Sequence, residues 1–191
     1  SNVDVVAGEK ATTIDLTALT HSASGLYEDE KQYSYSGGVN SGSVDARVSP
    51  SGTLTVSADK TATPGTTVSV PVSIKYAKGT VSAGMTVRVT ASNRPLARVT
   101  EKTVKIKAGS SEQVNLLSDA YNPFPDSSLT VISCKADDAA KLTIAGCDAS
   151  GNITIAVASD VGASTNTVLV TVQDGTKSKD REVTASITVS V

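Results

Sequence analysis

The stretch "SDAYNPFPDSSLTV" holds the only phenylalanine of the chain, Phe124, which lies between Pro123 and Pro125. An aspartate stands on either side of this group, so the stretch could form a metal loop, a ligand-binding loop or a structural corner. Proline fixes φ and lacks an N–H donor, so two prolines this close end a strand and stiffen the turn. We therefore expect a corner in which Phe124 packs over one end of a domain or against an adjoining one.

The two cysteines, Cys134 and Cys147, are 13 positions apart, a spacing that fits no CxxC redox or zinc pattern. Two strands joined by a short turn could bring them together in a disulfide between neighbouring strands, which would contribute about 3 kcal/mol. Such a bond is typical of an oxidising, extracellular setting. The alternative is two unpaired cysteines that act as small hydrophobic side chains.

Other residues with catalytic potential do not form a set. His21 is the only histidine, and no nucleophile-elbow glycine pattern accompanies it. One histidine and two cysteines make a poor zinc ligand set. Adjacent acids such as Asp137 and Asp138 point to opposite faces of a strand or are solvated in a turn. We expect no catalytic residues, no metal site built on these groups and no enzymatic activity.

Three of the five tyrosines, Tyr27, Tyr33 and Tyr35, lie close together in "GLYEDEKQYSYSGG". Tyrosine is favoured at interfaces because it offers a large rigid area and a hydroxyl group. These side chains could therefore contact a ligand. The alternative, which we favour, places Tyr33 and Tyr35 as alternate core residues of one strand.

The composition indicates the elements that hold these residues. β-branched Thr and Val are abundant, aromatic residues make up 3% and Trp is absent, which favours an all-β fold with aliphatic cores. The net charge is −2, without the basic stripe of a nucleic-acid binder. No apolar run approaches the roughly 20 residues that span a bilayer. The opening Ser1-Asn2 resembles a protease scar, so we expect a piece of a longer protein.

The sequence repeats with a period near 100. "VAGEKATTIDLTAL" resembles "KAGSSEQVNLLSDA", "SGTLTV" resembles "SGNITI", and "TVSVPVSI" resembles "TVLVTVQD", in the same order. The step from Val68 to Val87 is 19, as is the step from Val168 to Ile187. We predict a first domain over residues 1–93, a short semi-rigid linker over 94–101 and a second domain over 102–191.

The second copy reads as seven short strands with alternating apolar residues, a pattern that predicts an immunoglobulin-like sandwich. The expected strands are 102–107, 112–117, 128–134, 141–145, 152–158, 166–173 and 182–190. An ungapped alignment of the copies sets Tyr35 against Cys134 and Val48 against Cys147. In the first domain, an aromatic–valine contact is therefore expected in place of the disulfide.

The segment after Val114 runs through Leu116 and Leu117 into Ser118-Asp119, then Asn122-Pro123 and the strand Leu129-Thr130-Val131. It resembles the tandem bacterial Ig-like and cadherin-like repeats of large secreted or surface-attached proteins, notably of Gram-positive actinobacteria. The resemblance implies an Ig-like fold and a role as a stalk or adhesion module.

Calcium-binding relatives carry several acidic residues at this corner. Here the corresponding set is Asp119, Asn122 and Asp126, with Ser118 where an asparagine is usual. Calcium takes roughly six to eight oxygens, several of them from carboxylates. Two carboxylates seven residues apart are a weak set, so calcium is the alternative and no cofactor is the expectation.

The patterns predict two tandem Ig-like β-sandwich domains without catalytic residues. The resemblance implies that they belong to a larger bacterial surface or secreted protein, extracellular, in which they act as a stalk or spacer in adhesion. The expected partners are neighbouring repeats of the same chain, with no nucleic acid and no direct membrane contact. The alternative is an adhesin-type module that recognises a host protein or glycan through the tyrosine-rich loop of the first domain.

Overall fold

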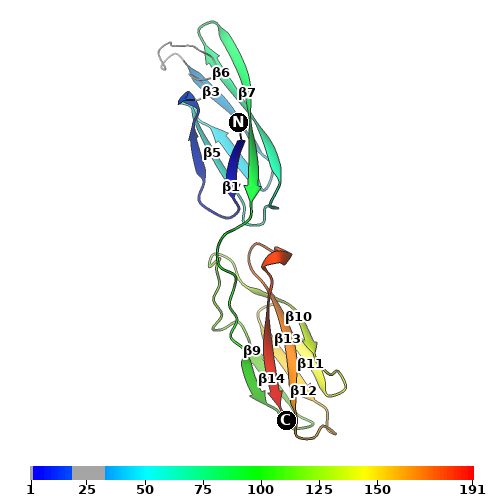
Figure 1. Cartoon of the computed structure of the whole chain (residues 1–191). Coiled ribbons are helices and arrows are strands. Elements are labelled where there is room, and N and C mark those ends of the chain that lie inside the picture. Colours follow the sequence, from blue (N-terminus) through cyan, green and yellow to red (C-terminus); the bar gives the residue numbers. More distant parts are fainter. Residues whose placement is uncertain (1, 19–32) are drawn as a thin grey trace. The chain divides into compact units, whose positions relative to one another are not determined.

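The computed structural model describes residues 2–18 and 33–191, and almost all of its regular structure is β-strand (Figure 1). The chain divides into two compact units, Ser1–Asn93 and Arg94–Val191, each with its own hydrophobic core. Residues 94–101, expected as a linker, thus belong to the second unit. Within the described residues, none of the helical turns is long enough and apolar enough to pass through a membrane.

In the described part of the first unit, seven strands form one continuous hydrogen-bonded run in the order β1-β7-β6-β3-β4-β5-β2. β1 pairs in parallel with β7, and the other pairs are antiparallel. The strands are β1 (Asn2–Val6), β2 (Thr12–Asp15), β3 (Ser34–Asn40), β4 (Val44–Val48), β5 (Thr53–Ala58), β6 (Thr67–Tyr76) and β7 (Gly79–Thr90).

β3 passes from one layer of this unit to the other. Its first half, Ser34–Gly37, pairs with β6, and its second half, Gly38–Asn40, pairs with β4. The change falls between Gly37 and Gly38, at φ 129° and 127°, which side chains of L-residues rarely allow. A Cβ on Gly37 would lie 2.1 Å from the Pro71 carbonyl oxygen, so glycine is required for this close backbone approach.

The second unit has two separate sheets, one in the order β10-β13-β14-β8 and one in the order β11-β12-β9. Each of the seven predicted strands of this copy is present, and all the predicted ends lie within two residues of the observed ones. The strands are β8 (Lys102–Lys105), β9 (Ser111–Asn115), β10 (Thr130–Ala136), β11 (Leu142–Cys147), β12 (Asn152–Val157), β13 (Thr165–Gln173) and β14 (Val183–Ser190).

The repeated sequence segments form strands that pair in the same way in both units. Val68 lies opposite Val87 in the first unit, and Val168 lies opposite Ile187 in the second, which explains the two equal steps of 19 residues. The strand orders of the units match position by position, with β8 and β14 parallel in place of β1 and β7. The all-β prediction and the prediction of two tandem β-sandwich domains are confirmed.

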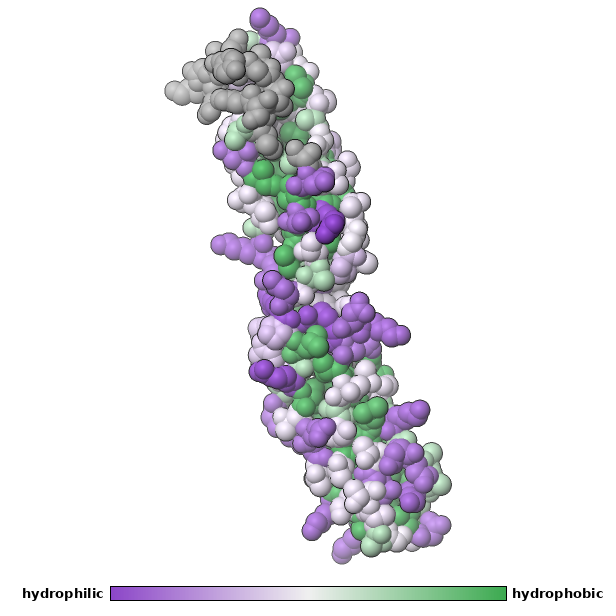
Figure 2. Space-filling view, viewed as in Figure 1, coloured by the Kyte–Doolittle hydropathy of each residue, from purple (hydrophilic) through white to green (hydrophobic). Residues whose placement is uncertain are grey.

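The cores consist mainly of Val, Ile, Leu and Ala. The alternation along β5, β12, β13 and β14 sends every second side chain inward. In the second unit, Val168, Val170 and Val172 of β13 and Ile187 and Val189 of β14 are all fully buried, and Val168 lies opposite Ile187. The face drawn in Figure 2 shows apolar side chains in small areas between polar ones.

Candidate functional site

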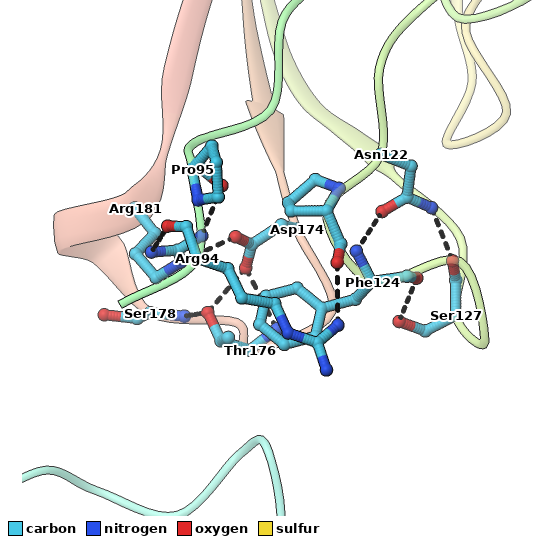
Figure 3. Close-up of polar contacts among 10 residues, drawn as sticks. Arg94, Pro95, Asn122, Phe124, Ser127, Asp174, Thr176, Ser178 and Arg181 are labelled. Atoms are coloured by element: carbon cyan, nitrogen blue, oxygen red, sulfur yellow. Dashed lines mark hydrogen bonds and ion pairs between the residues drawn. The ribbon is translucent and has the colours of Figure 1, made fainter. Parts of the chain in front are cut away.

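The proline-flanked Phe124 forms a closed corner of the second unit, as expected. The Phe124 side chain is 1% exposed. The Asn122 side chain holds the turn from both ends: Oδ1 accepts from the Phe124 N–H at 2.9 Å, and Nδ2 donates to the Ser127 carbonyl at 2.6 Å. The Ser127 N–H donates to the Phe124 carbonyl at 2.9 Å. The Ser127 hydroxyl donates to the same carbonyl at 3.2 Å (Figure 3). The turn is therefore fixed by hydrogen bonds as well as by its prolines.

Two arginines lie against the Phe124 ring. The guanidinium carbon of Arg94 is 4.5 Å from the ring centroid and that of Arg181 is 5.6 Å away. Arg94 also donates from Nη1 to the Pro123 carbonyl at 2.8 Å. A cation placed over an aromatic face contributes about 0.5–2 kcal/mol, more where it is desolvated.

Arg181 connects this corner to a buried acid. Its Nε donates to Oδ2 of Asp174 at 2.8 Å, while the other carboxylate oxygen accepts from both the N–H and the hydroxyl of Thr176 (Figure 3). The Asp174 side chain is 0% exposed and that of Arg181 is 12% exposed. A charge buried to this extent needs a charged partner and satisfied hydrogen bonds, and Asp174 has both.

The same arginine fastens the segment that was expected to be a linker. Arg181 Nη1 donates to the Arg94 carbonyl at 3.0 Å, and Nη2 donates to the Pro95 carbonyl at 2.9 Å. Ala97 is buried in the core of the second unit. Arg98 and Tyr121 exchange backbone hydrogen bonds of 3.2 and 2.8 Å, and the Arg98 guanidinium stacks on the Tyr121 ring at 4.5 Å. Residues from 94 onward are thus held by side-chain and backbone contacts, and the prediction of a linker over 94–101 is wrong.

We name this group of residues (Arg94, Phe124, Asp174, Thr176 and Arg181) the arginine corner. Sequence reasoning found Phe124 but missed the other four. One signal for Asp174 was present: the pattern Asp-x-Thr occurs at Asp15, Asp59 and Asp174, and each time the carboxylate accepts from the N–H and the hydroxyl of the threonine two residues later. The arginine partners carry no local signal, because they come from distant segments.

The residues suggested for calcium have other partners. Asp119 forms an ion pair with Lys102 at 2.8 Å, and this hydrogen bond is the main reason why the pKa of Asp119 is lowered. Both polar atoms of the Asn122 side chain hold the turn. Within residues 2–18 and 33–191, no three His, Cys, Asp or Glu side chains gather in a way that could hold a metal ion. The arrangement gives no support to calcium at Asp119, Asn122 and Asp126.

The tyrosines suggested for ligand contact divide into two cases. Tyr33 and Tyr35 are 9% and 3% exposed and belong to the core of the first unit, which agrees with the favoured interpretation of them as core residues and counts against a role as surface contacts. Their place follows from strand alternation: the ring of Tyr35 packs over Gly52, where an added Cβ would lie 2.9 Å from it. Tyr27 lies outside the described residues.

Cys134 and Cys147 are joined in a disulfide with their Cα atoms 6.3 Å apart. The expectation that this bond joins neighbouring strands of one sheet is wrong, because Cys134 is on β10 and Cys147 is on β11, which belong to different sheets. The bond therefore ties the edges of the two sheets together. β10 and β11 are consecutive in sequence, and the chain changes sheet between them.

The corresponding edge of the first unit is closed differently. Tyr35 lies opposite Ile74, whereas Cys134 lies opposite Val170, the counterpart of Val70, so Tyr35 and Cys134 are not equivalent positions. The expected aromatic–valine substitute for the disulfide is wrong. In the first unit, β3 itself joins the layers at Gly37 and Gly38, and backbone hydrogen bonds replace the covalent link.

Comparison with known proteins gives only distant similarity. No protein-family model and no curated protein matches the sequence. Solved structures that align with the whole chain include Drosophila N-cadherin EC1-4 (10% identity, TM-score 0.39) and human CDH23 EC21-23 (14%, 0.40). The endo-fucoidan hydrolase MfFcnA4 of glycoside hydrolase family 107 also aligns (12%, 0.37). The chain covers 48%, 66% and 27% of these structures respectively.

Proposed function

We propose that this chain is a non-catalytic pair of Ig-like modules in a larger bacterial surface or secreted protein, where it acts as a structural spacer in adhesion. The observation that carries the proposal is the shared plan of the units. Each has its own core, the same strand order and the same Val–Val or Val–Ile cross-strand pairing. Units of this kind can be repeated along a chain because each one folds around its own core.

The chemistry of the arginine corner supports a structural role. Both oxygens of Asp174 accept hydrogen bonds from within the corner, and all three donor nitrogens of Arg181 point to internal acceptors. A catalytic acid or base needs a substrate proton within reach. The buried carboxylate of Asp174 is instead turned toward its own partners, so its function is to fix the corner.

The intersheet disulfide supports an extracellular setting, because such bonds persist in oxidising compartments.

Small-angle X-ray scattering tests the spacer role. A single compact globule of 191 residues has a radius of gyration of about 16 Å. A spacer must separate what lies before it from what lies after it, so we expect a value clearly above that figure and a distance distribution with two maxima. A radius of gyration near 16 Å, measured beside a globular standard of the same mass, would overturn the spacer proposal.

A further inference from the structure

The first and last strands of each unit lie side by side and run in the same direction. β1 and β7 pair in parallel from Asn2–Thr86 to Val6–Thr90, and β8 and β14 pair in parallel from Lys102–Ile187 to Lys105–Ser190. Each pair is extended by one more backbone bond just beyond the strand. The Ala7 N–H donates to the Thr90 carbonyl at 3.1 Å, and the Ile106 N–H donates to the Ser190 carbonyl at 3.0 Å.

This geometry decides how a unit responds when its two ends are pulled apart. The first unit is entered at β1, the second is entered through residues 94–101 and then β8, and each is left after its last strand, so tension slides two parallel neighbours past each other. The interstrand hydrogen bonds run across the strands, and sliding therefore loads all of them together. Two antiparallel strands pulled from their open end would instead separate one bond at a time.

The disulfide lies inside the segment that these terminal strands enclose. Cys134 and Cys147 are 13 residues apart and fall between β8 and β14. When β8 and β14 separate, the covalent bond still holds residues 134–147 as a closed loop. The first unit closes the same edge with the backbone pairing at Gly37 and Gly38, which tension can pull open.

We propose that the parallel terminal strands form a mechanical clamp in each domain, and that the Cys134–Cys147 disulfide limits the length of chain that the second domain releases after its clamp opens. The inference rests on the proposed spacer function, because a module in series with others carries whatever tension they carry. In this proposal the terminal strands and the disulfide have separate roles. The clamp sets the force at which a domain opens, and the disulfide sets how far the opened domain extends.

Single-molecule force spectroscopy on the full chain, held at its two ends, tests both tasks. The first domain releases the 88 residue steps from Asn2 to Thr90, and the second releases the 96 steps from Arg94 to Ser190, because residues 94–101 are held in it. The disulfide withholds 13 of the steps of the second domain, which is about 40 Å of extended chain once the 6.3 Å between the two Cα atoms is subtracted. We therefore expect the length increment of the second domain to be about 40 Å longer in the reduced chain than in the oxidised chain, and that of the first domain to stay the same.

The matched variant is the double substitution Cys134→Ser and Cys147→Ser. We expect the length increment of the second domain to be about 40 Å longer than in the oxidised wild-type chain, while its unfolding force stays unchanged because β8 and β14 lie outside the disulfide loop. A marked drop in that force would show that the edge at Cys134, rather than the clamp, resists tension, and would overturn the proposal.

If the double variant does not fold, the wild-type chain with and without a thiol reductant still decides the question, since its first domain contains no cysteine and serves as the control. A second-domain increment that is the same in the oxidised and the reduced chain, or a gradual extension without distinct peaks, would contradict the proposal. A compact radius of gyration combined with the expected force peaks would remove the spacer function and leave the clamp in place. A radius of gyration well above about 16 Å without the expected force peaks would remove the clamp and leave the spacer function in place.

Discussion

The Nε atom of Arg181 lies 2.8 Å from Oδ2 of Asp174, whose side chain is entirely withdrawn from solvent. Replacing Arg181 with Met keeps most of the side-chain volume but leaves the buried carboxylate without its charged partner. Loss of one member of a buried ion pair costs about 3–5 kcal/mol. We expect the free energy of unfolding of the second domain to fall by that amount in urea titrations.

The control for burial is the exposed ion pair of Arg47 and Asp45, in which Nε lies 3.0 Å from Oδ2. Solvent screens this pair, so Arg47→Met should change the free energy of unfolding by less than about 1 kcal/mol. Equal effects of the two substitutions would contradict the importance given to burial. Adding Asp174→Leu to Arg181→Met should recover part of the lost stability, because no unpaired charge then remains.

Phe124 should be among the most sensitive positions of the second domain. Its side chain is fully buried and contacts both guanidinium groups of the arginine corner. Phe124→Ala should lower the free energy of unfolding by about 3–5 kcal/mol through the cavity it leaves. Leu169→Ala removes an apolar side chain that is 44% exposed and should have little effect in the same chemical denaturation. A loss below about 1 kcal/mol for Phe124→Ala would show that the corner contributes little to stability.

The layer change in β3 should tolerate no side chain. Gly37→Ala would place a Cβ 2.1 Å from the Pro71 carbonyl oxygen and force alanine into φ 129°, so we expect a loss of about 1–3 kcal/mol or more. Gly84→Ala in β7 meets nothing within 4 Å and is the matched control. Thermal unfolding followed by circular dichroism measures both variants. Similar melting temperatures for the two would count against a strict need for glycine at the crossing.

Reduction should affect the domains unequally. Replacing Cys134 and Cys147 with serine removes a cross-link over 13 residues, which should cost the second domain about 3 kcal/mol. The first domain contains no cysteine and should unfold at the same urea concentration as before. Amide hydrogen exchange resolved by peptide follows each domain separately. Faster exchange confined to the first domain would be the opposite of what the structure predicts.

Acid should weaken the turns that contain the Asp-x-Thr pattern. Hydrogen bonds from Thr17 and Thr61 lower the pKa of Asp15 and Asp59 below the ordinary value of 3.8. A lowered pKa in the folded state adds stability above the unfolded pKa, and this stability is lost as the pH falls through the folded pKa. The free energy of unfolding should therefore decrease below about pH 4, and less so in the double variant Asp15→Asn and Asp59→Asn.

Repeating the acid titration at low and high salt distinguishes the threonine hydrogen bonds from long-range charge–charge interactions as the cause of the lowered pKa values of Asp15 and Asp59. The leading contributions to both pKa shifts are hydrogen bonds from threonine, which ions screen weakly. The part of the pH dependence of the free energy of unfolding that comes from Asp15 and Asp59 should therefore change little between low and high salt. A contribution that disappears at high salt would point to charge–charge interactions instead.

Much of the fold could be predicted from local patterns. The alternation around Val168 and Ile187 determines which side chains face inward, and the repeated step of 19 residues is the length of a hairpin that places those two residues opposite each other. Both features depend on neighbouring residues, so sequence alone locates the strands of the second domain to within two residues.

The errors have a common physical origin. A period of two shows which face of a strand is buried but not which sheet the strand joins, so Cys134 and Cys147 were expected on the same sheet. The alignment of Tyr35 with Cys134 failed because the strand pairing of the two domains is offset by four residues at that strand. The contacts of Arg94 and Arg181 join segments 87 residues apart, a distance over which no local pattern operates.

The two ways of closing the sheet edge also have a consequence for biosynthesis. The glycine crossing in β3 is complete as soon as the backbone has paired, so the first domain can finish folding without an oxidant. The second domain reaches its final state only after an electron acceptor has oxidised two thiols. The maturation of one half of the chain therefore depends on the compartment in which it takes place, and that of the other half does not.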